Sequence, residues 1–286
     1  MIAGGEVNCV FLAAMLKDRH PTIFTNLRHV LMSHGIEVRL LKAVRDYWAK
    51  DYCPVQIGPG KLVKFRYDPD YLRDQPQLRT GDRVVKSIRG IGRCRRSDII
   101  LDGGNIVASR TKTILTDKVY KENPRWSRAD LRNTLRKLLR VDQLIIVPKE
   151  PYDNIGHADA MIRFIDEDTV LVSDYSKVDP GFGVRLIEVL RRNRLAIETI
   201  PYFHEKRSRA GIPSAVGCFA NFLHTEKVLI APIYGSKHDH LALRKLESVF
   251  PGLPIVPLDC TNLAREGGVL NCVCAGYRQS EKSISR

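Results

Sequence analysis

A cysteine near the end of the chain and a histidine near its middle are candidates for nucleophilic catalysis. Cys272 follows Gly267 and Gly268 in the stretch REGGVLNCVC, where glycines let the backbone approach a ligand closely. His157, in NIGHADAMIRF, can take up or release a proton near neutral pH, because its ordinary pKa is about 6.5. Cys274 lies two residues further on, in a segment with the pattern of a strand. It would share a face with Cys272 and is the alternative nucleophile.

Two aspartates are suited to bind a planar cation beside these groups. A guanidinium ion presents several N–H donors in one plane, so a site for it needs carboxylates placed for paired hydrogen bonds. Asp51, in WAKDYCP, and Asp159, two residues after His157, are the candidates. If the segment around His157 is extended, Asp159 points to the same side and both can face one ligand.

Each of these residues also has an ordinary structural explanation. An isolated cysteine is more often a small buried apolar side chain than a nucleophile, and a pair of glycines usually marks a turn. Aspartates such as Asp46, Asp51 and Asp102 commonly stay solvated or cap a helix. From the residue types alone, a cysteine hydrolase and a purely structural use of these side chains both stay open.

The elements that would position these residues form a recurring unit, in which an amphipathic helix leads into a short apolar strand. The spacing of apolar residues predicts this unit four times, at 21–41, 127–148, 183–201 and 239–257. Gly35 is placed to end the first helix. Ser127, with Asp130 three residues later, forms an acidic variant of a capping box. The pattern predicts an α/β protein whose modules bury their faces against each other.

Polar loops follow three of the predicted strands and carry the candidate residues. They contain RDYWAKDYCP, GHADAMIRF and EGGVLNCVCAG. Because rigid scaffolds present chemistry on loops at strand ends, we expect these loops to converge on one site. The stretch 58–83 is rich in Pro, Gly, Asp and Tyr, which indicates an ordered excursion with turns. We predict one catalytic domain over 1–278 and a disordered tail over 279–286, where QSEKSISR lacks apolar periodicity.

Composition narrows the class of protein. No apolar run approaches the roughly 20 residues that span a bilayer, and the first residues lack the basic region of a signal peptide, so we expect a cytoplasmic protein without membrane contact. Seven cysteines without CxxC pairs predict free thiols and no metal site.

The charge of the chain is its most unusual bulk property. A formal net charge of +14 favours anionic partners, and basic residues cluster at 86–96, 191–194 and 206–209. These clusters lack the aromatic residues that stack on bases and any groove-reading motif. A solvated basic surface is therefore favoured over nucleic-acid binding, which the charge alone does not exclude.

Five segments, taken in chain order, resemble the agmatine deiminase and bacterial-type (Porphyromonas-type) peptidylarginine deiminase family of guanidino-group-modifying enzymes. The family motifs are W-x-R-D-x-G-P, E-G-G-N, H-x-D-x-x-x-R-F, N-F and G-G-x-x-H-C. The similar segments are WAKDYCP at 48–54, LDGGN at 101–105, GHADAMIRF at 156–164, ANF at 220–222 and EGGVLNC at 266–272. Lys50, Cys53 and Asn271 stand where the family commonly has Arg, Gly and His. The resemblance implies a pentein-like fold, a five-module α/β propeller with pseudo-fivefold symmetry and a central active site.

The resemblance also implies a mechanism without metal or organic cofactor. Cys272 would be the nucleophile, His157 the general acid and base, and Asp51 and Asp159 the residues that bind the guanidinium group. The thiolate would attack the guanidinium carbon while His157 protonates the departing ammonia. Water activated by His157 would then release a ureido product from the covalent thiouronium. The implied hydrolase converts agmatine to N-carbamoylputrescine and ammonia, a step of putrescine biosynthesis.

Other positions acquire binding roles by the same resemblance. Asp102, where the family usually has Glu, would orient His157 or the substrate, and Trp48 would form a wall of the pocket. The further substrate-binding positions are Gly103, Gly104, Asn105, Gly267 and Gly268.

Two alternative functions are open. The first is deimination of peptidyl-arginine or another guanidino compound. The basic surface gives it slight support, because a dicationic small molecule would be repelled at long range. The second is a catalytically silent relative that binds RNA or has a regulatory role, suggested by the net charge and the motif departures. A homodimer is compatible with all of these hypotheses.

Overall fold

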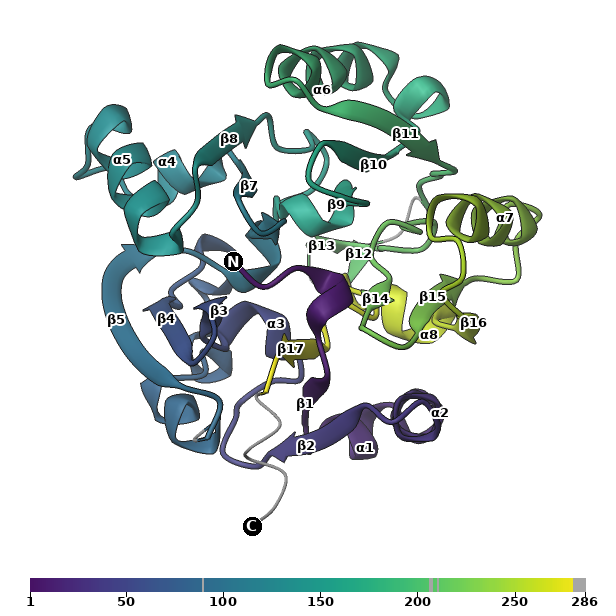
Figure 1. Ribbon diagram of the computed structural model, residues 1–286, viewed down its shortest axis with the longest axis horizontal. Coiled ribbons are helices and arrows are strands. Elements are labelled where there is room, and N and C mark those ends of the chain that lie inside the picture. Colours follow the sequence, from purple (N-terminus) through teal and green to yellow (C-terminus); the bar gives the residue numbers. More distant parts are fainter. Residues whose placement is uncertain (89, 206–207, 210, 280–286) are drawn as a thin grey trace.

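The computed structural model describes residues 1–88, 90–205, 208–209 and 211–279. The described strands form five three-stranded sheets and one two-stranded hairpin, arranged around a central axis (Figure 1). In each three-stranded sheet the central strand is antiparallel to one neighbour and parallel to the other. This common order confirms the prediction of repeated α/β modules.

The sheets follow one another along the chain, except that the first joins both ends. In spatial order the strands are β17 (Cys274–Tyr277), β1 (Cys9–Ala13) and β2 (Glu37–Leu41); β3 (Val55–Gly58), β4 (Lys61–Arg66) and β5 (Arg93–Ile100); β6 (Val107–Ala108), β7 (Lys112–Thr116) and β8 (Gln143–Val147); β9 (Ile162–Phe164), β10 (Thr169–Ser173) and β11 (Ala196–Ile200); β14 (Leu223–His224), β15 (Leu229–Ile233) and β16 (Ile255–Asp259). The hairpin consists of β12 (Ser208–Arg209) and β13 (Ile212–Pro213).

In four modules an α-helix connects the central strand to its parallel neighbour, as predicted, and lies at the periphery (Figure 1). These helices are α2 (Pro21–Ser33), α5 (Arg128–Leu139), α6 (Pro180–Arg192) and α7 (Asp239–Val249). Each forms because its apolar residues recur on one face; in α5, for example, Leu131, Leu135 and Leu139 are buried. The backbone N–H of Asp130 donates to the Ser127 side chain at 3.1 Å, which confirms the predicted cap. Gly35, with φ of 75°, ends α2 where the sequence indicated.

The second module differs from the other four in its crossover. Between β4 and β5 the chain forms 3₁₀ turns at Asp70–Leu72, Pro76–Leu78 and Asp82–Ile88 instead of an α-helix. The stretch 58–83 is therefore ordered and contains turns, as predicted. This stretch also contains β4 and begins the crossover of a module, which the sequence did not indicate because no helical period marks it.

Pairing of β17 with β1 closes the ring of modules. Leu12 lies opposite Cys274 and Cys9 opposite Tyr277 in this antiparallel pair. Gln279, which was assigned to the tail, is buried, and its N–H donates to the Asn8 side chain at 2.8 Å. The rest of the predicted tail, 280–286, lies outside the described residues.

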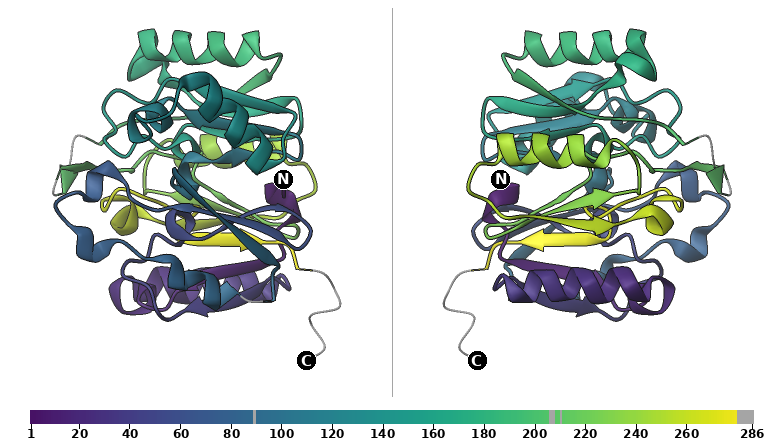
Figure 2. Two further views of the ribbon diagram at one scale, coloured as in Figure 1. Left: turned by 90° about the vertical axis from the view of Figure 1, so that its left-hand side faces the viewer. Right: turned by 90° about the vertical axis from the view of Figure 1, so that its right-hand side faces the viewer.

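The short helices and turns that connect one module to the next gather at one end of the ring. They include α3 (Ala49–Tyr52), the 3₁₀ turns Gly103–Asn105 and Ala158–Ala160, and α8 (Thr261–Ala264). The side views show α8 and the β12–β13 hairpin at this end and the N-terminus at the other (Figure 2). Two further short helices, α1 (Leu16–Arg19) and α4 (Lys118–Glu122), follow the central strands β1 and β7. Among the described residues, every helix is too short or too polar to cross a bilayer.

Candidate active site

Each predicted catalytic residue lies where the outer parallel strand of one module leads into the next module. Asp51 lies in α3, after β2, and Asp102 immediately precedes the 3₁₀ turn Gly103–Asn105, after β5. His157 precedes the 3₁₀ turn that contains Asp159, after β8, and Cys272 follows α8, after β16. The fold thus brings residues from four distant segments together, because equivalent loops of a closed ring meet near its axis.

Two cavities meet at Cys272 and His157. The larger, of about 370 Å³, is also lined by Asp51 and by aromatic and aliphatic side chains that include Trp48. The smaller, of about 50 Å³, is also lined by Asp159. The structure therefore places the predicted nucleophile, the imidazole and both carboxylates around connected space, as the hypothesis of one convergent site requires.

Two carboxylates contact the His157 ring. Nε2 lies 3.0 Å from Asp102 Oδ2, and Nδ1 lies 3.6 Å from Asp51 Oδ1. Burial alone would lower the pKa of His157, but Asp51 and the hydrogen bond with Asp102 raise it to about 9. The imidazole is consequently protonated at neutral pH. Burial raises the pKa of Asp51, an effect that His157 opposes and Asp102 reinforces.

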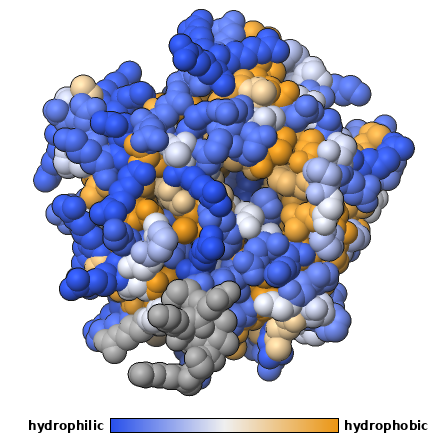
Figure 3. Space-filling view, in the orientation of Figure 1, coloured by the Kyte–Doolittle hydropathy of each residue, from blue (hydrophilic) through white to orange (hydrophobic). Residues whose placement is uncertain are grey.

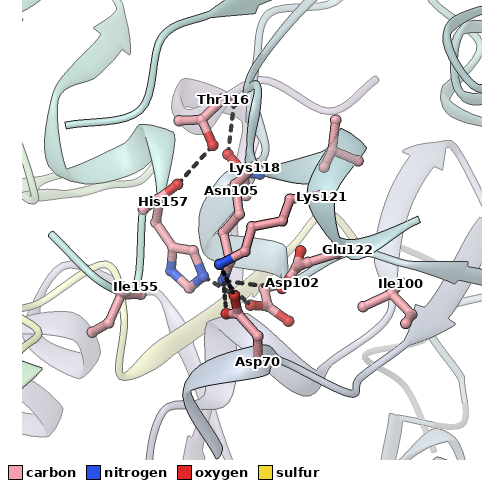
Figure 4. Close-up of polar contacts among 12 residues, drawn as sticks. Asp70, Ile100, Asp102, Asn105, Thr116, Lys118, Lys121, Glu122, Ile155 and His157 are labelled. Carbon is pink, nitrogen blue, oxygen red and sulfur yellow. Dashed lines mark hydrogen bonds and ion pairs between the residues drawn. The ribbon is translucent and has the colours of Figure 1, made fainter. Parts of the chain in front are cut away.

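Behind Asp102 and His157 lies a buried lysine, Lys118, that was not predicted from the sequence. Lys118 Nζ is 3.0 Å from Glu122 Oε1, 3.4 Å from Asp70 Oδ1 and 3.6 Å from Asp102 Oδ2 (Figure 4). Its side chain is only 2% exposed and lies over the Tyr71 ring at 4.6 Å. Lys118 supplies positive charge that holds Asp102 beside the imidazole. Its position at the start of α4 matches no motif in the sequence, so only the tertiary structure reveals it.

Neutral amides position Cys272. Its thiol donates to Asn221 Oδ1 at 3.4 Å, and the same oxygen accepts the Asn271 backbone N–H at 3.1 Å. Asn271 Nδ2 donates to Asp159 Oδ2 at 2.6 Å. The other oxygen of Asp159, Oδ1, is buried and has no hydrogen-bond partner within the described chain. Asn221 lies in the ANF segment that carries part of the resemblance, but nothing in the sequence indicated its contact with Cys272.

Cys272 favours its protonated form in this environment. Burial raises the pKa of its thiol, and Asp159 and Asp51 raise it further. A cation held between the two carboxylates would oppose that effect. The thiolate would then become easier to form when a positively charged ligand is bound.

Two local expectations were wrong. Cys274 does not share the face of Cys272: it lies in β17, fully buried, and lines a different cavity that does not include Cys272 or His157. The segment after His157 is a 3₁₀ turn and not extended, although His157 and Asp159 still line one cavity.

The glycines act mainly by allowing close approach of the loops. A Cβ on Gly104 would lie 2.4 Å from His157 Nδ1, and one on Gly103 would lie 2.0 Å from the Lys50 carbonyl oxygen. Gly268 packs in the same way against the Trp48 ring, and Gly267 adopts φ of 99°. Gly267 and Gly268 line the larger cavity.

Gly103, Gly104 and Asn105 support the site without lining either cavity at Cys272. Asn105 Oδ1 accepts the Thr116 backbone N–H at 2.8 Å, which fixes the turn behind His157. The N–H of Gly104 donates to Asp51 Oδ1 at 3.0 Å and so orients that carboxylate.

Two of the predicted basic clusters, 86–96 and 191–194, contribute no described residue to either cavity at Cys272. Arg93, Arg95 and Arg96 of β5 are exposed, as are Arg191, Arg192 and Arg194 at the end of α6. Lys206 and Arg207 of the third cluster lie outside the described residues. No group of three or more metal-binding side chains has the arrangement of a metal site in the described part of the chain.

Residues 10–277 match the family described as Porphyromonas-type peptidyl-arginine deiminase, and the chain belongs to this family. Agmatine deiminase of Pseudomonas aeruginosa is 26% identical over 226 residues, covering 67% of this chain and 61% of that protein. Agmatine deiminase of Ectopseudomonas mendocina is 24% identical over 222 residues, covering 67% and 60%. The chain thus spans about three fifths of the length of these curated relatives.

Solved structures confirm the fold. The agmatine deiminase of C. jejuni with substrate bound has a TM-score of 0.77 at 17% identity, with 98% of this chain and 96% of that chain covered. The agmatine deiminase of Enterococcus faecalis has a TM-score of 0.76 at 16% identity, with 98% and 95% covered. DDAH from Pseudomonas aeruginosa is more distant, with a TM-score of 0.61 at 11% identity and coverage of 95% and 99%. The five-module pentein-like propeller expected from the sequence is the observed architecture.

Proposed function

We propose that this chain hydrolyses a guanidino compound to a ureido compound and ammonia, with Cys272 as nucleophile. The observation that carries the proposal is the meeting of Cys272, His157, Asp51 and Asp159 around one pair of cavities. A planar cation with several N–H donors suits two carboxylates that line the cavities at one sulfur atom. Membership of a deiminase family supports the same chemistry.

The mechanism follows from the charges in the site. A guanidinium group between Asp51 and Asp159 lowers the pKa of Cys272, whose thiolate then attacks the central carbon. The C–N bond breaks as protonated His157 donates its proton to the departing ammonia. Neutral His157 next removes a proton from water, which displaces the sulfur and leaves the ureido product. Asp102 stabilises the protonated imidazole, because its Oδ2 lies 3.0 Å from Nε2.

Agmatine is the substrate that we favour. The family relatives include proteins named agmatine deiminase, one of them solved with substrate bound. The larger cavity has aromatic walls at Tyr47 and Trp48 that suit a chain of methylene groups, and Glu266 adds a carboxylate that suits the distal ammonium.

Deimination of an arginine peptide is the second candidate. Arg19 and Arg45 also line the larger cavity, where they would favour a substrate with a carboxylate over one with a second positive charge.

All seven cysteines are free thiols, which is consistent with our proposal of a cytoplasmic location, where the reducing environment keeps thiols reduced.

Incubation with agmatine, free arginine and a C-terminal arginine peptide tests both candidates, with ammonia and ureido product measured together. We expect the highest kcat/KM for agmatine and no turnover by Cys272→Ala. Preference for the peptide, lost in Arg45→Gln, would assign the second candidate instead. Absence of turnover with every guanidino compound, together with salt-dependent binding of RNA, would replace the enzymatic proposal by the RNA-binding alternative.

A further inference from the structure

A separate cavity lies at the other end of the ring from the catalytic loops. It measures about 110 Å³, and its lining includes the N-terminal Met1 and Ile2 together with Lys50, Arg163 and other residues. The face that carries the N-terminus is hollowed at its centre (Figure 3). A cavity of about 10–15 Å³ holds one water molecule, so this cavity has room for an ion with four oxygens.

The lining of this cavity is basic. Lys50 and Arg163 line it, and no Asp or Glu does among the described residues. Neither the Lys50 ammonium nor the Arg163 guanidinium has a hydrogen bond or an ion pair with any described residue. The guanidinium lies over the Phe222 ring at 4.9 Å, which stabilises a cation but does not neutralise it.

The two cations also destabilise each other. Burial lowers the pKa of Lys50 and the nearby Arg163 lowers it further, and Asp159 and Asp51 offset only part of this effect. His224 lines the same cavity, and burial together with Arg163 lowers its pKa to about 4, so its ring is neutral at pH 7 and offers a hydrogen bond without charge. Asp159 partly compensates both cations, but it lines the catalytic cavity and not this one, so a bound anion would stabilise the two cations from the open side.

We propose that this cavity binds a small oxyanion with the size and charge of inorganic phosphate, between Lys50 and Arg163. Arg163 provides a planar set of donors for two oxygens, and Lys50 provides a point charge for another. Larger ligands are excluded by the volume of the cavity and by close packing at its rim, where a Cβ on Gly4 would lie 2.9 Å from His224 Nδ1.

The cavity is coupled to the catalytic end through adjacent residues. Lys50 directly precedes Asp51, and its backbone N–H donates to the Cys272 carbonyl oxygen at 3.0 Å. Asn271, which directly precedes Cys272, lines the basic cavity. The charges of Lys50 and Arg163 favour the Cys272 thiolate, so a bound anion would make the thiolate less stable. This inhibitory effect rests on the proposed function, whereas anion binding does not.

Thermal unfolding tests the binding step. Inorganic phosphate, titrated at constant ionic strength with chloride as the balancing ion, should raise the Tm of the wild-type chain saturably by about 2–4 °C at ten times Kd. Lys50→Met should lose this shift. Arg191→Gln, which removes one exposed positive charge from α6, should keep it. An equal shift in both variants would overturn the proposal, because phosphate would then act elsewhere.

If Lys50→Met does not fold, a second variant and a direct binding measurement still test whether phosphate binds in this cavity. Arg163→Gln should also lose the shift, and the phosphorus-31 NMR line of phosphate should broaden with the wild-type chain but not with Arg163→Gln. An unchanged line in the presence of the wild-type chain would refute binding.

Alkylation of Cys272 by 2-chloroacetamidine, followed by mass spectrometry, tests the coupling. We expect the rate to fall by up to about tenfold in phosphate, as a rise of one unit in the pKa of Cys272 predicts, with the same midpoint as the thermal shift. A rate independent of phosphate, in a chain that shows the thermal shift, would retain the site but remove its inhibitory role. No alkylation under any condition would instead count against the proposed function.

Discussion

The two sides of the candidate site are held by different kinds of contact. On the His157 side, Asp51, Asp102 and Lys118 form a buried network of charges. On the Cys272 side, the neutral amides of Asn221 and Asn271 position the thiol and the Asp159 carboxylate through hydrogen bonds. The protein alone therefore gives His157 the protonated form that it needs. It does not give Cys272 the thiolate form, because the thiol stays protonated without a ligand.

This difference indicates which part of the site a substrate completes. The His157 side already carries compensating charges, because the imidazole lies 3.6 Å from Asp51, so a guanidinium ion gains less at Asp51 than at Asp159. Asp159 Oδ1 on the Cys272 side is buried without a partner in the described chain, and Asp159 also raises the pKa of Cys272. A guanidinium ion would satisfy that oxygen and activate the sulfur at once, so binding and activation are coupled most strongly at Asp159.

The largest effect that separates the two sides should come from Asp159→Asn. The amide keeps the shape but cannot hold the cation, and we expect kcat/KM to fall about 10³-fold. The same change should lower the pKa of Cys272 in the free protein, so alkylation by neutral iodoacetamide should become faster. Asp98→Asn, which removes an exposed carboxylate of β5, is the matched control and should match the wild type in both measurements. Slower alkylation in Asp159→Asn would contradict the assigned electrostatics.

The next effect concerns the charged side. Lys118→Met leaves Asp102 and Glu122 buried without their cation, so we expect a loss of about 4 kcal/mol in the free energy of unfolding, measured with urea. Lys121→Met is the control in the same helix, because Lys121 is exposed and, among the described residues, forms one ion pair, with Asp70 at 3.0 Å. Its expected loss is within about 0.5 kcal/mol. Equal losses in the two variants would show that the buried network does not stabilise the fold.

The pH–kcat profile of Lys118→Met is a second measurement, and a purely structural role of Lys118 would leave this profile unchanged. Lys118 lowers the pKa of His157, so its removal should raise the pKa of the imidazole. The basic limb of the pH–kcat profile should shift upward accordingly.

The sequence was sufficient to predict the scaffold and the four side chains that meet at the candidate site. Helical spacing located α2, α5, α6 and α7, because each has one apolar face against a sheet. Ordered motifs located Cys272 and His157, since the resemblance linked segments that spacing alone could not.

The sequence was insufficient where contacts depend on the tertiary structure. Lys118 lies in an ordinary helical turn, and its burial results from packing against the 3₁₀ turns of another module. The crossover between β4 and β5 has no period that could mark it as a module. Cys274 has the right spacing for a shared face, but the strand begins only after Cys272 and so directs the two thiols to different cavities.

A pH dependence of stability should come from His157. Its folded pKa of about 9 exceeds the value of about 6.5 in an unfolded chain, so the folded state binds the proton more tightly. This contribution, up to about 3 kcal/mol, is complete below pH 6.5 and is lost as the pH rises through 9. Urea unfolding between pH 6 and 10 should show the decline in the wild type, and His157→Gln should be flatter over that range. An equally steep decline in the variant would assign the effect to other groups.

The smallest effect should come from the neutral side, at Asn271. Asn271→Ala removes the 2.6 Å hydrogen bond to Asp159 Oδ2 but leaves the carboxylate free to bind a cation, so we expect kcat/KM to fall only about tenfold. Asn271→His, which installs the residue common in the family at this position, retains a donor and should lose less. Both variants should be assayed without phosphate, because Asn271 also lines the basic cavity. A loss as large as that of Asp159→Asn would mean that the amide, and not the substrate, holds this carboxylate in its active position, and the contrast between the two sides would no longer stand.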